Sequence, residues 1–235
     1  MNTSNKTNLF DYENDANKIF ETLKNGGVSI NPILSGYAIM GATDESITKI
    51  YTAKQRPLDK PSGIVSNFRT HNEIHMINSE HKQIVKDFSE NYEFPLAVLA
   101  PFDDSHALFQ NLTPFMRSIG TKNSTVNFLI NSGPLRSHIA NLSMDNEFPM
   151  IASSANVSGS GVKYKVEDIE PELLSAADLV IDYGEVPYQK FDSSGFPLSS
   201  TIIDFQSMKV MRQGVFFEEL VAVFYEQYNL KFDTD

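Results

Sequence analysis

The chain of 235 residues contains no cysteine. Disulfide bridges, cysteine-ligated zinc sites and thiol nucleophiles are therefore excluded, and several enzyme classes with them. Positive charge is also scarce, because 19 lysines and arginines stand against 30 aspartates and glutamates, for a formal net charge of -11. Non-specific binding to nucleic acid depends on basic residues that neutralise phosphates, so the overall charge argues against it, although a local basic patch stays open.

Long apolar runs are absent as well. No run approaches the roughly 20 apolar residues that a membrane-spanning helix needs, and the first 15 residues lack the charged-then-apolar pattern of a secretory signal. We therefore expect a cytoplasmic protein with no membrane contact. With 41% apolar and 21% charged residues the composition is that of an ordinary globular protein. The length allows one large domain or two small ones.

Helix-like and strand-like segments follow one another without a strict βαβ rhythm. Hydrophobic spacing, caps and breakers predict helices at residues 16–25, 43–56, 79–92, 106–120, 133–143 and 215–230. Short β-rich runs predict strands at 28–33, 62–68, 94–102, 124–131, 148–154, 199–205 and 207–214, and residues 166–184 hold a further helix and strand. We therefore expect one mixed-sheet α/β domain over residues 15–235, preceded by a flexible lead-in at residues 1–14 and closed by the last helix.

A cluster of small polar residues follows the predicted strand at 148–154. Residues 151–159 read IASSANVSG, with three serines, an asparagine and a glycine in seven positions. Taken alone, such a cluster is more often a turn, because these side chains bond their own backbone. It could also be a cradle in which hydroxyl and backbone N–H groups hold a phosphate or oxyanion. It is neither a Walker loop nor a Rossmann turn, since GxxxxGK and GxGxxG are both missing.

Cations gather at the end of the predicted helix at 43–56. The segment KQRPLDK places Lys54, Arg56 and Lys60 within seven residues. In isolation, basic residues there usually complement the helix dipole, but they could also bind a polyphosphate or carboxylate. The five histidines, His71, His75, His81, His106 and His138, lack a spacing typical of a metal site, and we expect them to be structural or solvated.

These elements resemble the Sua5/YrdC/YciO family when they are taken together and in order. The chain has a KxRPxxKP block near residue 55, an SSANxSG block near 155, an STIID strand near 202 and an RQG turn near 213. The resemblance covers roughly residues 15–216. It implies a single YrdC-like domain with a twisted, mixed and mostly open sheet flanked by helices. It also implies a positively charged groove on that domain.

The resemblance implies a reaction and a site. The best understood members make L-threonylcarbamoyl-AMP from threonine, bicarbonate and the Mg²⁺ complex of ATP, for the t6A modification of tRNA. It assigns nucleotide binding to a first set of residues, Lys54, Arg56, Ser154, Asn156, Ser158 and Arg212. It assigns the remaining substrate to a second set, Pro32, Tyr37, Lys60, Ser153 and Ser200.

The departures from the family pattern fall mostly on the side that holds threonine. NPILSGYAI stands where the family has PTETVYGL, Leu129 stands at an expected strand arginine, and Ala97 stands at an expected threonine. Three outcomes stay open: a threonylcarbamoyl-AMP synthase with compensating residues, a synthase of another carbamoyl or acyl adenylate, or a non-catalytic module that binds nucleotide or double-stranded RNA. The oligomeric state and protein partners do not follow from the sequence.

Overall fold

The computed structural model describes residues 10–233. The strands within this range are β1 (Ser29–Ile33), β2 (Gly36–Gly41), β3 (Gly63–Ile64), β4 (Leu96–Pro101), β5 (Thr121–Lys122), β6 (Thr125–Ile130), β7 (Ile151–Ser154), β8 (Leu179–Val180), β9 (Thr201–Asp204) and β10 (Lys209–Arg212). The α-helices are α1 (Tyr12–Lys24), α2 (Asp44–Ala53), α3 (Phe68–Ile74), α4 (Ser79–Asn91), α5 (Ala107–Gln110), α6 (Pro114–Gly120), α7 (Pro134–Asp145), α8 (Pro171–Ala176) and α9 (Phe217–Tyr228), and a 3-10 turn covers Val166–Asp168.

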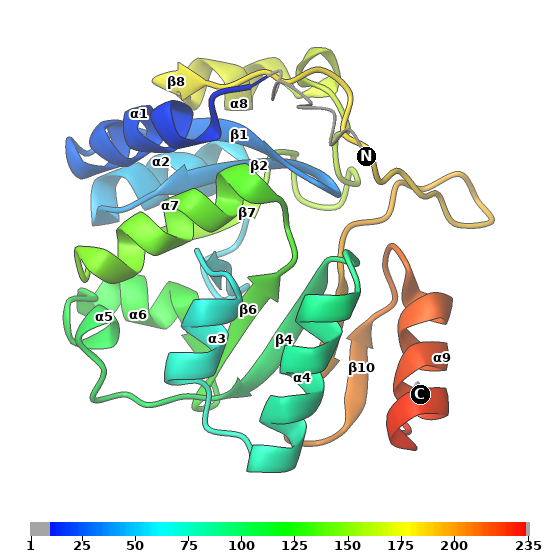
Figure 1. Cartoon of the computed structure of the whole chain (residues 1–235). Coiled ribbons are helices and arrows are strands. Elements are labelled where there is room, and N and C mark those ends of the chain that lie inside the picture. Colours follow the sequence, from blue (N-terminus) through cyan, green and yellow to red (C-terminus); the bar gives the residue numbers. More distant parts are fainter. Residues whose placement is uncertain (1–9, 234–235) are drawn as a thin grey trace, which may run out of the picture.

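The described strands form one sheet in the order β10-β9-β4-β6-β3-β7-β2-β1-β8, with β5 paired to β6. Neighbours such as β1 and β2, β2 and β7, and β4 and β6 are antiparallel, whereas β4 and β9, and β3 and β6, are parallel. Helices flank this mixed, open sheet (Figure 1). The prediction of a single α/β domain with such a sheet is confirmed.

The two faces of the central strands carry side chains of different size. Successive strand residues point to opposite faces. On one face most of the paired residues are small: Gly63 lies opposite Ala152, Ala38 lies opposite Ser154, and Ala97 lies opposite the larger Leu129. The other face carries the bulky residues Val98, Phe128 and Ile151, which are buried in the core. The small residues leave a hollow on their face of the sheet, and this hollow becomes the candidate site.

Helices cover the sheet by burying apolar stripes. In Figure 1, α1 and α7 lie side by side, and their Ile19, Leu23, Ile139 and Ala140 share one buried cluster. The closing helix α9 packs on the core as predicted, since Phe224 is fully buried and its ring lies 5.1 Å from that of Phe88 in α4. Within residues 10–233, no helix combines the length and the apolar character that crossing a membrane requires.

Several predicted boundaries were wrong for local reasons. Helix α1 begins at Tyr12, because the side chain of Asp11 caps it by accepting from the N–H of Asn14 at 3.1 Å. Residues 12–14 are therefore helical rather than part of the lead-in, and residues 1–9 of that lead-in lie outside the described range. The strand predicted at 62–68 is reduced to β3, because Asn67 caps the unpredicted helix α3.

Two further elements differ from the sequence prediction. The segment after β1 turns back as β2, and Gly36 makes the turn possible with φ of +145° and no room for a Cβ beside Val162. The single helix predicted at 106–120 is two short helices, α5 and α6. Thr113 caps the second one and Pro114 occupies its first turn, a position that proline favours.

Candidate functional site

The hollow on the small-residue face of the sheet is a cavity of about 680 Å³. Ten of the eleven predicted site residues line it: Tyr37, Lys54, Arg56, Lys60, Ser153, Ser154, Asn156, Ser158, Ser200 and Arg212. They come from elements as distant in sequence as β2 and β10, which the sheet brings to one place. Pro32 does not line this cavity; it lies in β1 and lines a separate cavity beside Tyr183 and Pro187.

Lys54 holds the loop that follows β7. Its side chain is only 1% exposed, and Nζ donates hydrogen bonds to the carbonyl oxygens of Ser154 and, at 2.6 Å, of Asn156. The carbonyl of Lys54 in turn accepts from the N–H of Ser158 at 2.9 Å. Burial, and then the nearby charge of Arg56, lower the pKa of Lys54 to about 7. The lysine and the small polar loop therefore form one unit.

That loop presents acceptors and donors that the protein does not use. Oδ1 of Asn156 and Oγ of Ser158 are buried and have no hydrogen-bond partner among residues 10–233. Buried polar atoms are nearly always paired in folded proteins, because an unpaired one is costly. Nδ2 of Asn156 donates to the carbonyl of Val157 at 2.6 Å, which fixes the direction of the amide. The loop thus has hydrogen-bonding atoms without a partner in the described part of the chain, one an acceptor and one a hydroxyl, at the wall of the cavity.

Two arginines that are far apart in the sequence line the cavity, and each donates hydrogen bonds to backbone carbonyls. Arg56 donates to the carbonyl of Lys60 at 3.2 Å and to that of Pro61 at 2.5 Å. Arg212 donates through Nε and Nη2 to the carbonyl of Ser200, at 3.0 and 2.7 Å. Neither arginine forms an ion pair with a described carboxylate. Their positive charge is therefore available to an anion.

A glycine allows Arg212 to lie where it does. Gly214 follows β10, and a Cβ built there would lie 2.1 Å from the carbonyl oxygen of Ser199. Its N–H donates to Oγ1 of Thr201 at 3.0 Å, which ties the RQG turn to β9. Only a residue without a side chain allows this approach. The sequence prediction included Arg212 but did not show that its turn requires glycine at position 214.

Some predicted site residues use their hydroxyl groups within the protein. The hydroxyl of Tyr37 lies 2.9 Å from Oδ1 of Asp182 and 2.7 Å from the carbonyl of Gly184, so it holds that turn. Burial, and then the hydrogen bond to Asp182, raise the pKa of Tyr37. Oγ of Ser200 lies 2.9 Å from Oγ of Ser35. Substrate roles for these two residues stay predictions.

The remaining lining includes two residues that the sequence prediction missed. Asn127 and Arg136 line the cavity, together with the apolar Leu129 and Ala97 that mark the departures from the family pattern. Arg136 lies on α7 and is only 4% exposed. A pattern in the sequence could have revealed it, since Arg136 falls on the same helical stripe as the buried Ile139 and Ala140. An arginine is seldom buried unless an opposite charge pairs with it, so a buried arginine on such a stripe indicates a partner in the protein or in a ligand.

The histidines lie apart from the cavity. His71 and His75 are buried in α3 and at its end, with their Nδ1 atoms 2.8 Å apart, and Nε2 of His75 lies 3.3 Å from the carbonyl of Val126. Burial lowers the pKa of both, that of His71 to about 3. The part of the chain that the structure describes has no group of three or more histidines and acids placed to hold a metal ion.

Comparison with known proteins shows the family of the chain. A family model named for Sua5, YciO and YrdC, and described as "Telomere recombination", matches residues 21–214. A relative from Methanocaldococcus jannaschii, provisionally named as a threonylcarbamoyl-AMP synthase, is 28% identical over 214 residues, which cover 86% of this chain and 89% of the relative.

Two solved structures share the fold. A hypothetical protein of Streptococcus mutans UA159 superposes with a TM-score of 0.71 at 20% identity, covering 90% of this chain and 91% of that one. Sua5 of P. abyssi complexed with L-threonine superposes with a TM-score of 0.65 at 20% identity, covering 86% of this chain. This chain covers only 54% of the Sua5 chain, so it matches about half of that protein's length. With the family model matched over residues 21–214, the chain belongs to the Sua5/YciO/YrdC family.

Proposed function

We propose that this protein is an L-threonylcarbamoyl-AMP synthase, which joins threonine, bicarbonate and ATP with release of pyrophosphate and supplies t6A modification of tRNA. One observation carries the proposal. Three cations without a described carboxylate partner, on Arg56, Lys60 and Arg212, line the same cavity as the unspent polar atoms of Asn156 and Ser158. In a nucleotide, the polyphosphate offers negative charge to the cations and acceptors to the hydroxyl of Ser158, and the ribose or base offers a donor to Oδ1 of Asn156.

The proposed reaction asks the protein to align reactants and stabilise charge. Threonine and bicarbonate form a carbamate with loss of water. A carbamate oxygen then attacks the α-phosphorus of ATP, and pyrophosphate leaves with the bonding electron pair. Negative charge spreads over the phosphate oxygens during this transfer, and fixed cations stabilise it. Arg56 and Arg212, held rigidly by backbone carbonyls, are suited to that task.

Magnesium enters this proposal as part of the ATP complex. We assign it no protein ligand, since the described residues offer no cluster of acids and histidines for it. Its chemistry is to neutralise the phosphate oxygens of the nucleotide and of the departing pyrophosphate. The protein's own residues bind the nucleotide through the loop after β7 and through the arginines.

Two relatives support the substrate side of the proposal. The M. jannaschii protein bears the name of this activity and aligns with 86% of the present chain. The P. abyssi Sua5 structure holds L-threonine, and its fold matches this one. Both relationships are consistent with a cavity that accepts an amino acid beside a nucleotide.

A second function has an observation in its favour. Leu129 and Ala97 line the cavity where the family resemblance leads us to expect an arginine and a threonine. A charge-assisted hydrogen bond to a carboxylate is worth about 1.5 to 3 kcal/mol, and leucine cannot supply one. A synthase of another carbamoyl or acyl adenylate, or a module that binds nucleotide or double-stranded RNA without turnover, would fit these two residues.

Pyrophosphate release tests the proposal and separates it from the second function. Pyrophosphate would be measured after purified protein is incubated with Mg-ATP, L-threonine and bicarbonate together. The measurement would then be repeated with each of the three components omitted in turn. The proposal predicts release only in the complete mixture. Release with another amino acid, or nucleotide binding without any release, would support the second function instead.

A further inference from the structure

Arg136 is a buried cation without a described counter-ion. It is 4% exposed, and it forms no ion pair within residues 10–233. Nη1 donates only to the sulfur of Met40 at 2.7 Å, and Nε has no partner. Burial lowers its pKa to about 10, so the guanidinium is still protonated at neutral pH. A buried charge without an opposite charge is destabilising, so its presence needs an explanation.

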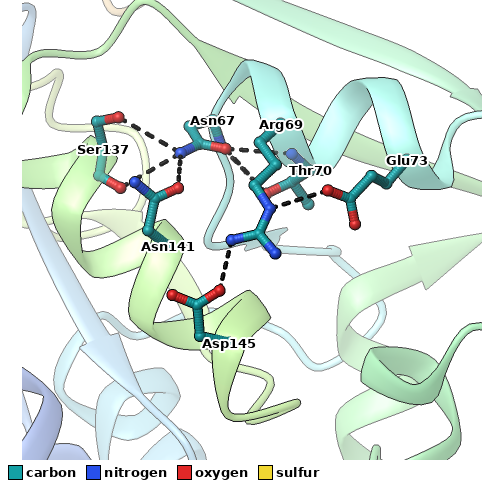
Figure 2. A network of polar contacts seen from close by, with 7 residues as sticks. All are labelled: Asn67, Arg69, Thr70, Glu73, Ser137, Asn141 and Asp145. Carbon is teal, nitrogen blue, oxygen red and sulfur yellow. Dashed lines mark hydrogen bonds and ion pairs between the residues drawn. The ribbon is translucent and has the colours of Figure 1, made fainter.

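Arg69, whose side chain is partly exposed and lies outside the cavity of the candidate site, has two carboxylate partners. In Figure 2 its guanidinium lies between Glu73, at 2.8 Å, and Asp145, at 2.6 Å. In the same network Nδ2 of Asn67 donates to Oδ1 of Asn141 at 2.8 Å, which joins α3 to α7. The network fixes the helix that carries Arg136 and supplies two carboxylates to Arg69. Arg136 receives none.

Buried polar atoms that have no hydrogen-bond partner within residues 10–233 also lie on the face of the sheet that Arg136 covers. The side-chain amide of Asn31, Oγ of Ser29 and Oδ1 of Asn127 are buried and have no partner among the described residues. Asn31 lies opposite Ala38 in the β1–β2 pair, and Ser29 lies opposite Met40, the residue that Arg136 contacts. Paired residues of neighbouring strands share one face of the sheet. The unpartnered groups of β1 therefore lie on the face that Arg136 covers.

The position of Arg136 suits a small molecule next to the nucleotide. Met40 lies opposite Ala152 in β7, and Ala38 lies opposite Ser154, where the polar loop begins. Two strand residues span roughly 7 Å, so the Arg136 contact lies about that far along the sheet from the loop. Arg136 and Leu129 line one cavity, although they come from different elements, α7 and β6. An arginine on α7 can therefore act where the strand arginine is missing.

We propose that Arg136 binds the carboxylate of the amino-acid substrate, and so takes the role that the family resemblance assigns to an arginine at position 129. The inference rests on the proposed function for the identity of the ligand as an amino acid. The planar guanidinium suits a carboxylate, which accepts two parallel hydrogen bonds from it. The ligand then supplies the counter-ion that the protein lacks. Arg136 is a binding and specificity-determining residue, and it makes no bond in the chemical step.

Calorimetric binding of L-threonine and of L-threoninamide, which lacks the carboxylate, tests the inference. The intact chain would be compared with Arg136→Met, with Arg136→Met/Leu129→Arg, and with Arg69→Met as the matched control outside the cavity. We expect Arg136→Met to weaken threonine binding at least tenfold and to leave threoninamide unchanged. Arg69→Met should bind threonine as the original chain does. In the double variant, the arginine introduced at position 129 should restore part of the affinity for threonine that Arg136→Met removes.

Several results would overturn the inference. One is that Arg136→Met binds threonine as tightly as the original chain does. Another is that the original chain binds threonine and threoninamide equally, and a third is that the original chain does not bind threonine. Misfolding is not expected, because methionine removes an unpaired buried charge. Arg136→Lys serves as a second variant that keeps the charge and loses the planar fork, and we expect it to bind threonine with intermediate affinity.

The outcome is separable from that of the proposed function. If threonine binds through Arg136 but no pyrophosphate is released, the proposed synthase activity fails and the inference stands. If pyrophosphate is released and Arg136→Met leaves the KM for threonine unchanged, the activity stands and the inference is overturned. A raised KM for threonine with an unchanged affinity for ATP supports both.

Discussion

Nζ of Lys54 donates a hydrogen bond to the backbone carbonyl of Asn156 at 2.6 Å, across about 100 residues of sequence. A second bond from the same ammonium goes to the carbonyl of Ser154. An ammonium has three donors, so one remains for a ligand. Lys54 therefore shapes the polar loop and is also placed to contact what the loop binds.

The lowered pKa of Lys54 predicts that nucleotide binding depends on pH. Its value of about 7 means that the ammonium is charged at pH 6 and largely neutral at pH 8.5. An anion binds the charged form, so ATP affinity should fall as the pH rises through 7, by up to about tenfold per pH unit above the pKa. Calorimetric titrations with ATP at pH 6, 7 and 8.5 would measure this change.

Lys54→Met is the comparison for that titration. Ionisation of the nucleotide itself affects both proteins equally, so only the difference between the two pH profiles reports on Lys54. We expect weaker binding and a flatter profile in the variant. Identical profiles would show that the ammonium does not contact the nucleotide.

Removal of either cavity arginine should weaken ATP binding. Arg56→Ala and Arg212→Ala each delete a guanidinium that has no carboxylate partner among residues 10–233, and charge-assisted bonds are worth about 1.5 to 3 kcal/mol. Each variant should therefore bind ATP roughly 10- to 100-fold more weakly. The matched control is Lys209→Ala on the same strand as Arg212, where the lysine pairs with Asp233 at 3.1 Å. An equal loss in the control would point to a general charge effect and not to the cavity.

Gly214→Ala should destabilise the protein because a Cβ would lie 2.1 Å from the carbonyl oxygen of Ser199. Forcing such an overlap costs about 2 to 3 kcal/mol. Gly184→Ala is the control: its φ is +77°, and a Cβ there meets no atom within 4 Å, so the cost should be about 1 kcal/mol from the backbone alone. Urea denaturation would compare the two. Equal losses would mean that the turn after β10 adapts to a side chain.

The buried histidine pair should make stability depend on pH. The folded pKa of His71, about 3, lies below its ordinary value of 6.5, and that of His75 is lowered as well. The unfolded chain therefore binds more protons between these values, so the free energy of unfolding is highest above pH 6.5 and falls as the pH drops toward 3. Each histidine contributes up to about 1.4 kcal/mol per pH unit in that range.

Urea denaturation at pH 7, 6 and 5 would measure this slope. His71→Gln/His75→Gln should flatten it, because neither glutamine takes up a proton. His138→Gln replaces an exposed histidine and serves as the control. An unchanged slope in the double variant would show that other groups cause the dependence.

Local patterns predicted much of the fold, and the family resemblance predicted ten of the residues that line the cavity. The helix predicted at residues 43–56 is present as α2, and Thr43 begins it with a capping box. The cations after that helix and the small polar residues after β7 are short motifs, so their presence did not depend on distant contacts. Gathering them into one cavity required the sheet order, which the family resemblance supplied and single-residue patterns could not.

The missed features depend on contacts between distant segments. The strand β2 is buried along its whole length, so it lacks the polar alternation that reveals a half-buried strand. The short helix α3 owes its start to the cap at Asn67 more than to any apolar repeat. The helical stripe that Arg136 shares with Ile139 and Ala140 marks the arginine as buried. Its place beside the cavity depends on α7 lying over Met40, 96 residues earlier, and the sequence around Arg136 does not show that contact.

The most direct test of the central claim is transfer of labelled bicarbonate into an adenylate. Protein would be incubated with ¹³C-bicarbonate, L-threonine and Mg-ATP, and the products would be separated and weighed by mass spectrometry. We predict an adenylate that carries one ¹³C and the mass of threonine, absent when threonine is omitted and reduced in Arg56→Ala. ATP binding with no labelled adenylate under any of these conditions would contradict the synthase account.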